Sequence, residues 1–462
     1  MKQLYFKDDL QVKEMVVDKR EKGGTVLSKE ESIKVVVIGA GSVIFGPPLL
    51  YDLIRNIESR NLVISLVDID EEKLGLISNA ADVIGSVEAA EVEIESSTDR
   101  TEVLEEADFV LITVEEDRIE RWKLDWEIPK EFGIEHTLGE NRGPAGLSHT
   151  LRTVPLVLGI AEDVERLAPQ ASVLVLTNPE DRVAYAVENY TSLKVAGYCD
   201  GPWDFKDRYL GTLLGIPGEE IYLEGAGINH AIWLRKIVHR PTGKDLYPDL
   251  LQKASRKDWQ PFGQHLYKTY GFWPHENDEH YGEYFNYACD YIDCNGYDFA
   301  AHLEKAENWK AMLEALEKEE YREEDFVRNV ADLYWKVFGD SPPSDVIRGV
   351  SCGEERFLPG IDITNDGKIP GLPEDMIVEV PAVATPGGIS GIKWEAFPDE
   401  LTSFLYREAV IQRLSAEAAA EGSRNKALKA LLLDSHIDDP RTARNLLEEF
   451  ISVHEDYFPE LT

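Results

Sequence analysis

Cysteine, basic residues and long apolar runs are all scarce in this chain of 462 residues. It contains 4 Cys, and its 48 Lys and Arg face 87 Asp and Glu, which gives a formal net charge of −39. A field this negative repels phosphate backbones and anionic lipid headgroups, so neither nucleic acid nor a membrane surface is an expected partner. No apolar run approaches the roughly 20 residues that a membrane span requires.

The cysteines lie at positions 199, 289, 294 and 352 and form no C-x-x-C pattern. A long chain with so few cysteines is not a disulfide scaffold. The opening residues MKQLYFKDDLQVKEMVVDKREKGG carry a charge every few positions, and they lack the apolar core of a secretory signal. We therefore expect a reducing, cytoplasmic setting.

Apolar residues make up 43% of the chain and aromatic residues 10%, which is enough for a sizeable folded core. Several segments are apolar at nearly every position, as strands of a parallel sheet covered on both faces are. These predicted strands are Lys34–Gly39, Asn61–Asp68, Ala107–Thr113 and Ala171–Asn178, with a crossover helix at Leu151–Leu167. The pattern predicts an α/β fold with a Rossmann-type, doubly wound parallel sheet.

The chain is too long for one ordinary domain, because single cores stop growing at roughly 250–300 residues. We expect a charged extension over residues 1–31, a nucleotide-binding domain over 32–196 and a second, α+β domain over 197–462. The second domain begins where aromatic residues become dense, and it is expected to end in amphipathic helices over Leu401–Tyr457.

A glycine turn follows the first predicted strand in the run VVVIGAGS. Gly39 permits a tight turn, and Gly41 and Ser42 lie where the backbone can approach a pyrophosphate at a helix N-terminus. Asp68 ends the next strand, where a carboxylate can hold the ribose hydroxyls of NAD and would repel the 2′-phosphate of NADP. The alternative is a structural glycine turn beside a surface Asp.

Cys199 and His230 are a candidate pair of metal ligands. Each follows an apolar or glycine-flanked segment, in YCDG and GINHAIWL, that could deliver it to a cleft. A thiolate and an imidazole suit a borderline divalent metal and leave positions open for substrate oxygens. On spacing alone, a buried apolar Cys and a hydrogen-bonded His explain the residues equally well.

Several ordered motifs together resemble glycoside hydrolase family 4, whose members are glycosidases that depend on NAD and a divalent metal and share the lactate and malate dehydrogenase fold. The resemblance covers most of the chain from about Ile33. It is carried by GAGSVIFGPPLLYDL, GENRGPAGLSHTLRTVP, TNPED, YCDG, GINHAIWL, ENDEHYGEYFNY and GLPEDMIVEVPA.

The resemblance implies a redox-assisted elimination in place of the usual displacement between two carboxylates. Hydride transfer from carbon 3 of the sugar to NAD creates a ketone, which makes the proton on carbon 2 removable by a side-chain base. A divalent metal, for which Mn²⁺ is our first choice, stabilises the enediolate. Loss of the aglycone, addition of water and return of the hydride complete the cycle.

The same resemblance implies roles for individual residues. Cys199 and His230 would bind the metal, Asn178 and Asn229 would contact the sugar, and Asp200 would act as acid toward the leaving group. Arg152 would bind a substrate anion or order the site, although a helix-surface Arg is the alternative. The predicted base is Asp278, with Tyr270 or Tyr281 behind it; the acidic stretch around Asp278 could equally be a solvated loop.

The substrate signals conflict. Asp200 after the metal Cys resembles some 6-phosphoglycosidases, whereas the Asp-x-His-x-x-Glu-Tyr pattern from Asp278 resembles the branch that acts on unphosphorylated α-glucosides, α-galactosides or α-uronides. We predict a glycosidase for an α-linked hexoside or uronide, with a 6-phosphoglycosidase as the alternative. A hydroxy-acid or polyol dehydrogenase and a non-catalytic NAD sensor are further hypotheses. Family habit predicts a homodimer or homotetramer.

Overall fold

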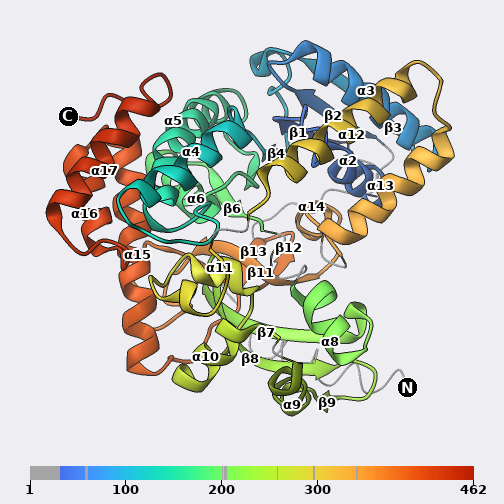
Figure 1. Cartoon of the computed structure of the whole chain (residues 1–462). Helices are drawn as coiled ribbons and strands as arrows, with labels where there is room; N and C mark the ends of the chain where they lie inside the picture. The colour runs from blue at the N-terminus through green and yellow to red at the C-terminus, as the bar shows by residue number, and fades with distance from the viewer. Residues whose placement is uncertain are drawn as a thin grey trace.

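The computed structural model describes residues 32–57, 61–199, 201, 205–257, 259–294, 297–339 and 342–462. One sheet of 13 strands runs through this part of the chain in the order β10-β8-β7-β12-β11-β6-β5-β4-β1-β2-β3, with β13 paired to β12 and β9 to β8. Helices cover it, as Figure 1 shows. The expected extension over residues 1–31 lies outside the described residues.

The first half of the sheet is parallel. Its strands are β1 (Ile33–Ile38), β2 (Leu62–Val67), β3 (Val92–Ser97), β4 (Phe109–Ile112), β5 (Ser172–Val175) and β6 (Lys194–Gly197). Alternate residues of β1 enter different cores, because Val35 and Val37 pack on one face and Val36 and Ile38 on the other. This burial on both faces confirms the predicted doubly wound sheet.

The second half of the sheet is antiparallel. It contains β7 (Ile221–Ile228), β8 (Ala231–His239), β9 (Lys244–Asp245), β10 (Trp273–Pro274), β11 (Arg356–Thr364), β12 (Ile377–Thr385) and β13 (Gly388–Gly391). The halves join where Asp362 of β11 lies opposite Gly197 of β6. The two predicted domains thus share one continuous sheet.

Helices from both ends of the chain cover the parallel half. On one face, α12 (Phe299–Glu317) and α13 (Glu323–Val337) pack on α2 (Gly46–Asn56) and α3 (Glu71–Val87), beside the blue strands in Figure 1. Elsewhere, α15 (Asp399–Glu421) packs on α5 (Gly143–Leu167) and α6 (Glu180–Tyr190), α16 (Arg424–Leu433) packs on α15 and α5, and α17 (Pro440–Val453) packs on α4 (Arg118–Glu131). C-terminal helices therefore complete the nucleotide-binding half.

The remaining helices lie around the antiparallel half and its junction with the parallel half. They are α8 (Thr212–Leu214), α9 (Tyr247–Lys257), α10 (Pro261–Tyr270), α11 (Asp278–Gly282) and α14 (Ser344–Ser351), with a π-helix at Phe205–Gly211 and 3-10 turns at Gly218–Glu220 and Ala288–Asp290. A further 3-10 turn, Arg100–Glu102, lies between β3 and β4 in the parallel half. In the described part of the chain, no helix has the length and apolar character needed to cross a membrane.

The turn after β1 is tightly confined. Gly39 has φ +89°, and a Cβ atom built there would lie 2.2 Å from the carbonyl oxygen of Thr113. The backbone N–H groups of Gly39 and Ala40 both donate to the carbonyl of Val67, at 2.8 and 3.0 Å. The ends of β1, β2 and β4 therefore meet at a position that only glycine can occupy without strain.

A row of buried carboxyl groups crosses the junction of the two half-sheets. Asp362 of β11 lies opposite Glu379 of β12, and Glu180 at the start of α6 fills the space that a side chain at Gly197 would need. All three acids are at most 2% exposed. Burial raises the pKa of Glu180 and Glu379 well above the usual range and that of Asp362 to about 7. The neighbouring carboxyl group of Asp362 raises the pKa of Glu180 further.

Replacing Gly39 with Ala is expected to destabilise the protein by about 2 kcal/mol or more, because the substitution combines a positive φ with a clash against backbone. Gly133→Ala is the matched control: its φ is +75°, but no atom lies within 4 Å of the added Cβ. Urea unfolding measures both. Equal losses of stability would show that the contact with Thr113 does not constrain the turn.

Glu180→Gln is expected to gain stability over the wild type as the pH rises. In the folded protein the pKa of Glu180 is raised above its usual value of 4.5. The wild-type protein therefore loses stability as the pH rises from that usual value toward the raised pKa, by about 1.4 kcal/mol per pH unit. Urea unfolding at pH 5 and pH 8 tests this, with Glu162→Gln at an exposed position of α5 as control. An advantage that does not grow with pH would contradict a protonated Glu180.

Candidate active site

Cys199 and His230 meet, as the sequence predicts. Cys199 lies two residues beyond β6, and His230 occupies the turn between β7 and β8 with φ +63°. The distance between Cys199 Sγ and His230 Nε2 is 3.1 Å. Two segments that are 31 residues apart thus place a thiol and an imidazole in direct contact at the edge of the sheet.

The surroundings of His230 fit a divalent metal. Its Nδ1 lies 3.3 Å from the side-chain nitrogen of Asn141, while Asn141 Oδ1 is buried without a hydrogen-bond partner. Turning this amide over lets Oδ1 accept the Nδ1–H proton and leaves the Nε2 lone pair facing Cys199. Burial lowers the pKa of His230 well below its usual value, which favours the neutral imidazole that metals bind. A thiolate and an imidazole in this arrangement can share one cation.

His280 and Glu283 extend this cluster, and the sequence analysis did not single them out. The rings of His230 and His280 are 4.3 Å apart between centroids, and ligand atoms of His230, His280 and Glu283 lie within 4.8 Å of one another. Burial by itself would lower the pKa of His280, but Glu283, Glu276 and Glu140 more than compensate and raise it to about 9. The His-x-x-Glu spacing within ENDEHYGEY was the available signal.

Asp278, the first choice for the base, is held elsewhere. Its Oδ2 accepts the backbone N–H of Phe262 at 2.9 Å and its Oδ1 that of Gly263 at 2.7 Å, so it caps the first turn of α10. Burial raises its pKa to about 6. The carboxylate thus anchors α11 to α10 through both of its oxygens, and its role as the base stays a prediction.

The two tyrosines named as further candidates for the base also serve the core. The hydroxyl of Tyr281 donates to the carbonyl of Ile232, and burial raises its pKa well above the usual value. Tyr270 is hydrogen-bonded to Tyr287, and burial raises its pKa as well. Both rings pack edge-on against Trp233 at 5.3 Å. The structure therefore does not bring either hydroxyl to the Cys199–His230 pair.

Asn178 lies in a network of charged groups at the end of β5. It precedes a cis peptide bond to Pro179, and its Nδ2 donates to Glu140 Oε1 at 3.1 Å. The same carboxylate accepts from Arg118 at 2.5 Å, and Arg118 also pairs with Glu115. Burial would raise the pKa of Glu115, but Arg118 and His149 lower it to about 2. The network orients the amide that the sequence predicts to contact a sugar.

Arg152 has a structural partner. Its guanidinium binds both oxygens of Asp125, at 3.0 and 2.7 Å, in a fully buried pair. Asp125 also bonds His454 at 2.9 Å and accepts from Ser148 at 2.5 Å. Through Asp125 the residue ties α4 and α5 to the segment after α17, and its expected role in binding a substrate anion or ordering the site stays a prediction.

Asn229 and Asp200 are also residues that the sequence predicts for the site. Asn229 is fully buried, and its Nδ2 donates to Asp362 in the carboxyl row at 3.4 Å. Its carbonyl accepts from Tyr284 and Arg142. Asn229 thus supports the turn that carries His230, and the structure does not place its side chain in a cavity. Asp200, the predicted acid, lies outside the described residues.

The predicted nucleotide residues come together at the carboxyl ends of β1 and β2. Asp68 Oδ2 accepts the backbone N–H of Gly41 at 2.8 Å, and Oδ1 accepts that of Asp70 at 2.9 Å. A Cβ atom at Gly41 would lie 2.7 Å from this carboxylate. Ser42 lies in the same turn, and its carbonyl accepts the first N–H of α2. The remaining lone pairs of Asp68 suit ribose hydroxyls.

A cavity of about 840 Å³ lies beside the segment that carries His280. The charges of Arg118 and Glu140 act on the pKa of Tyr297 and of His302, which lie in the cavity wall. The cavity therefore lies next to the Asn178 network. Its charged lining residues are Asp278, Glu279, Asp293, Asp298, His302 and Lys305.

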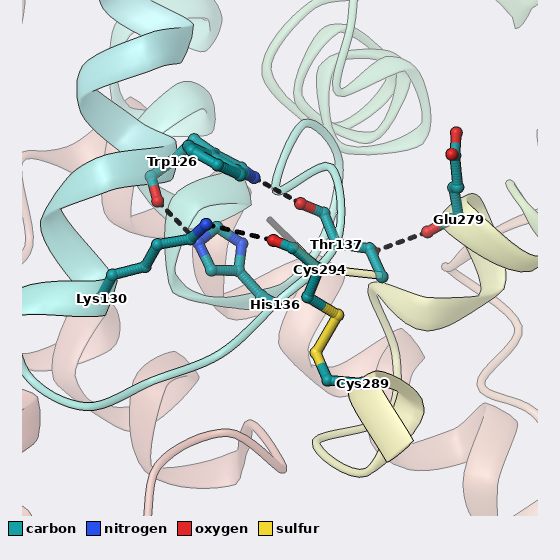
Figure 2. Close-up of a disulfide and its surroundings, with 7 residues drawn as sticks. All are labelled: Trp126, Lys130, His136, Thr137, Glu279, Cys289 and Cys294. Carbon is teal, nitrogen blue, oxygen red and sulfur yellow. Dashed lines mark hydrogen bonds between the residues drawn. A yellow bond between two sulfur atoms is a disulfide. The ribbon is translucent and has the colours of Figure 1, made fainter. Parts of the chain in front are cut away.

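One wall of the cavity contains a disulfide that the sequence analysis did not expect. Cys289 and Cys294 are bonded, with Cα atoms 5.5 Å apart, because the turn at Ala288–Asp290 brings them together. Figure 2 shows the bond beside Thr137, whose hydroxyl donates to the carbonyl of Glu279, and Lys130, which donates to that of Cys294. A disulfide was not expected in the reducing setting that the sequence predicts, and Cys199 and Cys352 take no part in it.

Curated relatives match over nearly their whole length. An α-glucosidase of Erwinia rhapontici is 28% identical, covering 91% of this chain and 97% of that protein. An α-galactosidase of Bacillus subtilis is also 28% identical, covering 92% and 99%. A 6-phospho-α-glucosidase from gut microorganisms, solved with NAD and glucose-6-phosphate, has the same fold with a TM-score of 0.79 at 20% identity, covering 94% of this chain and 100% of that one.

Two family models account for most of the chain. The model described as family 4 glycosyl hydrolase matches residues 34–214, and the model of that family's C-terminal domain matches residues 225–437. The first match contains the nucleotide turn, Asn178 and Cys199, and the second contains His230 and His280. The chain therefore belongs to family 4 of the glycosyl hydrolases.

Proposed function

We propose that this chain is an NAD- and divalent-metal-dependent glycosidase that cleaves an α-linked hexoside or uronide. The observation that carries the proposal is the 3.1 Å contact between Cys199 Sγ and His230 Nε2. A hydrolase that uses paired carboxylates would have no need of this pair. The α-glucosidase and α-galactosidase relatives support the choice of an α-linked sugar.

Support for the cofactors comes from the donor groups and from a solved relative. A 6-phospho-α-glucosidase from gut microorganisms was crystallised with NAD and Mn²⁺; its TM-score is 0.78 at 21% identity. In this chain Gly39, Gly41, Ser42 and Asp68 form the turn that would hold NAD. Cys199 and His230 would hold the metal, for which Mn²⁺ stays our first choice.

When bound at the turn of Gly39, Gly41, Ser42 and Asp68, NAD would supply reversible hydride transfer at carbon 3 of the sugar, and a divalent ion held by Cys199 and His230 would supply Lewis acidity toward neighbouring sugar oxygens. The chain's own residues position the substrate. Glu140 fixes the amide of Asn178, which leaves the other amide atoms for sugar hydroxyls. Arg118 neutralises Glu140 within the network. The acid role of Asp200 stays a prediction.

The lining of the cavity favours an unphosphorylated sugar. It presents four carboxyl groups, of Asp278, Glu279, Asp293 and Asp298, against one lysine, Lys305. Burial lowers the pKa of His302, which favours its neutral form. A dianionic 6-phosphate would be repelled, whereas neutral hydroxyls can hydrogen-bond to carboxylates.

A homodimer or homotetramer in the cytoplasm also stays a prediction.

The function is tested with nitrophenyl α-glucoside, α-galactoside, α-galacturonide and α-glucoside 6-phosphate in the presence of NAD, Mn²⁺ and dithiothreitol. We expect hydrolysis of an unphosphorylated α-glycoside that stops after metal chelation and removal of nucleotide and returns when both are restored. Cys199→Ser is expected to lower kcat/KM by about 1,000-fold or more, because an activating metal contributes several kcal/mol.

Cys352→Ser is the matched control, since Cys352 is the other described cysteine outside the disulfide; it should keep wild-type activity. Hydrolysis that survives exhaustive removal of nucleotide and metal would overturn the proposal. Net NADH formation without release of nitrophenol would instead identify a dehydrogenase, and preference for the 6-phosphate would overturn the substrate assignment.

A further inference from the structure

We propose that His280 is a third protein ligand of the divalent metal and that Glu283 holds it in place. This inference rests on the metal dependence proposed above and adds to it a ligand from a different segment of the chain. His280 lies in α11, 50 residues beyond His230, and its ring packs edge-on against the ring of His230.

The spacing of the donor atoms of His230 and His280 suits a single ion. Two donors that each lie about 2.0–2.4 Å from one ion are at most about 4.8 Å apart. Ligand atoms of His230, His280 and Glu283 all fall within 4.8 Å of one another. Cys199 Sγ in turn lies 3.1 Å from Nε2 of the His230 imidazole. His230 is thus common to both contacts.

Glu283 is arranged as the residue that orients His280. Its Oε2 accepts the backbone N–H groups of Asn141 and Arg142, at 2.7 and 2.9 Å, which fixes the carboxylate. Its Oε1 lies 3.4 Å from His280 Nδ1. A ligating histidine usually gives its second ring nitrogen to such a carboxylate, so His280 would offer Nε2 to the ion. Asn141 therefore contacts His230 through its side chain and Glu283 through its backbone N–H.

The local structure explains why His280 points this way. Asn277 caps α11 by accepting the N–H groups of Glu279 and His280, at 2.9 and 3.1 Å. Asp278 fastens the helix to α10. His280 and Glu283 are three residues apart and thus lie on one side of the turn. About 22% of the His280 side chain is exposed, against 1% for Glu283, so the imidazole is the group that solvent and substrate can reach.

One thiolate and two imidazoles, each having lost the proton that the ion replaces, would leave a divalent ion with a net charge of about +1 and with open positions. Three protein ligands with a vacant position are usual in catalytic metal sites, where substrate or water completes the coordination. Two ligands alone would hold the ion weakly in the absence of substrate. His280 therefore accounts for metal retention between turnovers.

The test is Mn²⁺ binding to nucleotide-free protein, followed by electron paramagnetic resonance, with electron spin echo modulation to count the bound imidazole nitrogens. Wild-type protein is expected to show two imidazoles. His280→Gln is expected to show one and to raise the Kd at least about 10-fold, and Glu283→Gln to raise it about 10- to 100-fold. His265→Gln, on α10, is the matched control and should bind as wild type does.

Cys199→Ser separates this inference from the proposed function. If Cys199→Ser loses Mn²⁺ while His280→Gln keeps wild-type affinity and a two-imidazole spectrum, His280 is not a ligand and the proposed function stands. If Cys199→Ser and His280→Gln both bind as wild type does, the metal site itself is wrong. Should His280→Gln fail to fold, the wild-type spectrum still decides: a single bound imidazole overturns the inference.

Discussion

The contact between Cys199 and His230 depends on one line of residues across the sheet. Gly197 of β6 pairs with Asp362 of β11, Asp362 with Glu379 of β12, and Glu379 with Gly227 of β7. Cys199 lies two residues beyond one end of this line and His230 three residues beyond the other. The register of four strands therefore sets the distance between the thiol and the imidazole, and burial raises the pKa of the carboxyl groups of Asp362 and Glu379 within the line.

Much of the parallel half could be predicted from the sequence, because its inner strands are apolar at nearly every position. The edge strand β3 was not predicted, since its sequence VEIESS mixes polar and apolar residues, and β6 is only four residues long. The antiparallel half was less predictable. Its strands come from distant segments, and no local pattern shows that β11 will lie between β6 and β12.

Motifs identified which residues gather near the site better than they identified where each side chain points. Cys199, His230 and the nucleotide turn could be predicted because each directly follows an apolar or glycine-flanked strand within its own motif. Arg152 and Asp278 could not, because their partners, Asp125 and the first turn of α10, lie far away in the sequence or outside the motif. His280 lies in the motif ENDEHYGEYFNY, but the sequence analysis selected Asp278, two residues earlier, as the functional residue.

The central claim is that Cys199 and His230 bind one divalent ion. The most direct test is a crystal structure of the protein with Mn²⁺ and NAD, with anomalous diffraction collected on both sides of the manganese absorption edge. The account predicts one manganese peak within about 2.5 Å of both Cys199 Sγ and His230 Nε2. A peak at the buried carboxyl row, or no peak beside the thiol and the imidazole, would contradict it.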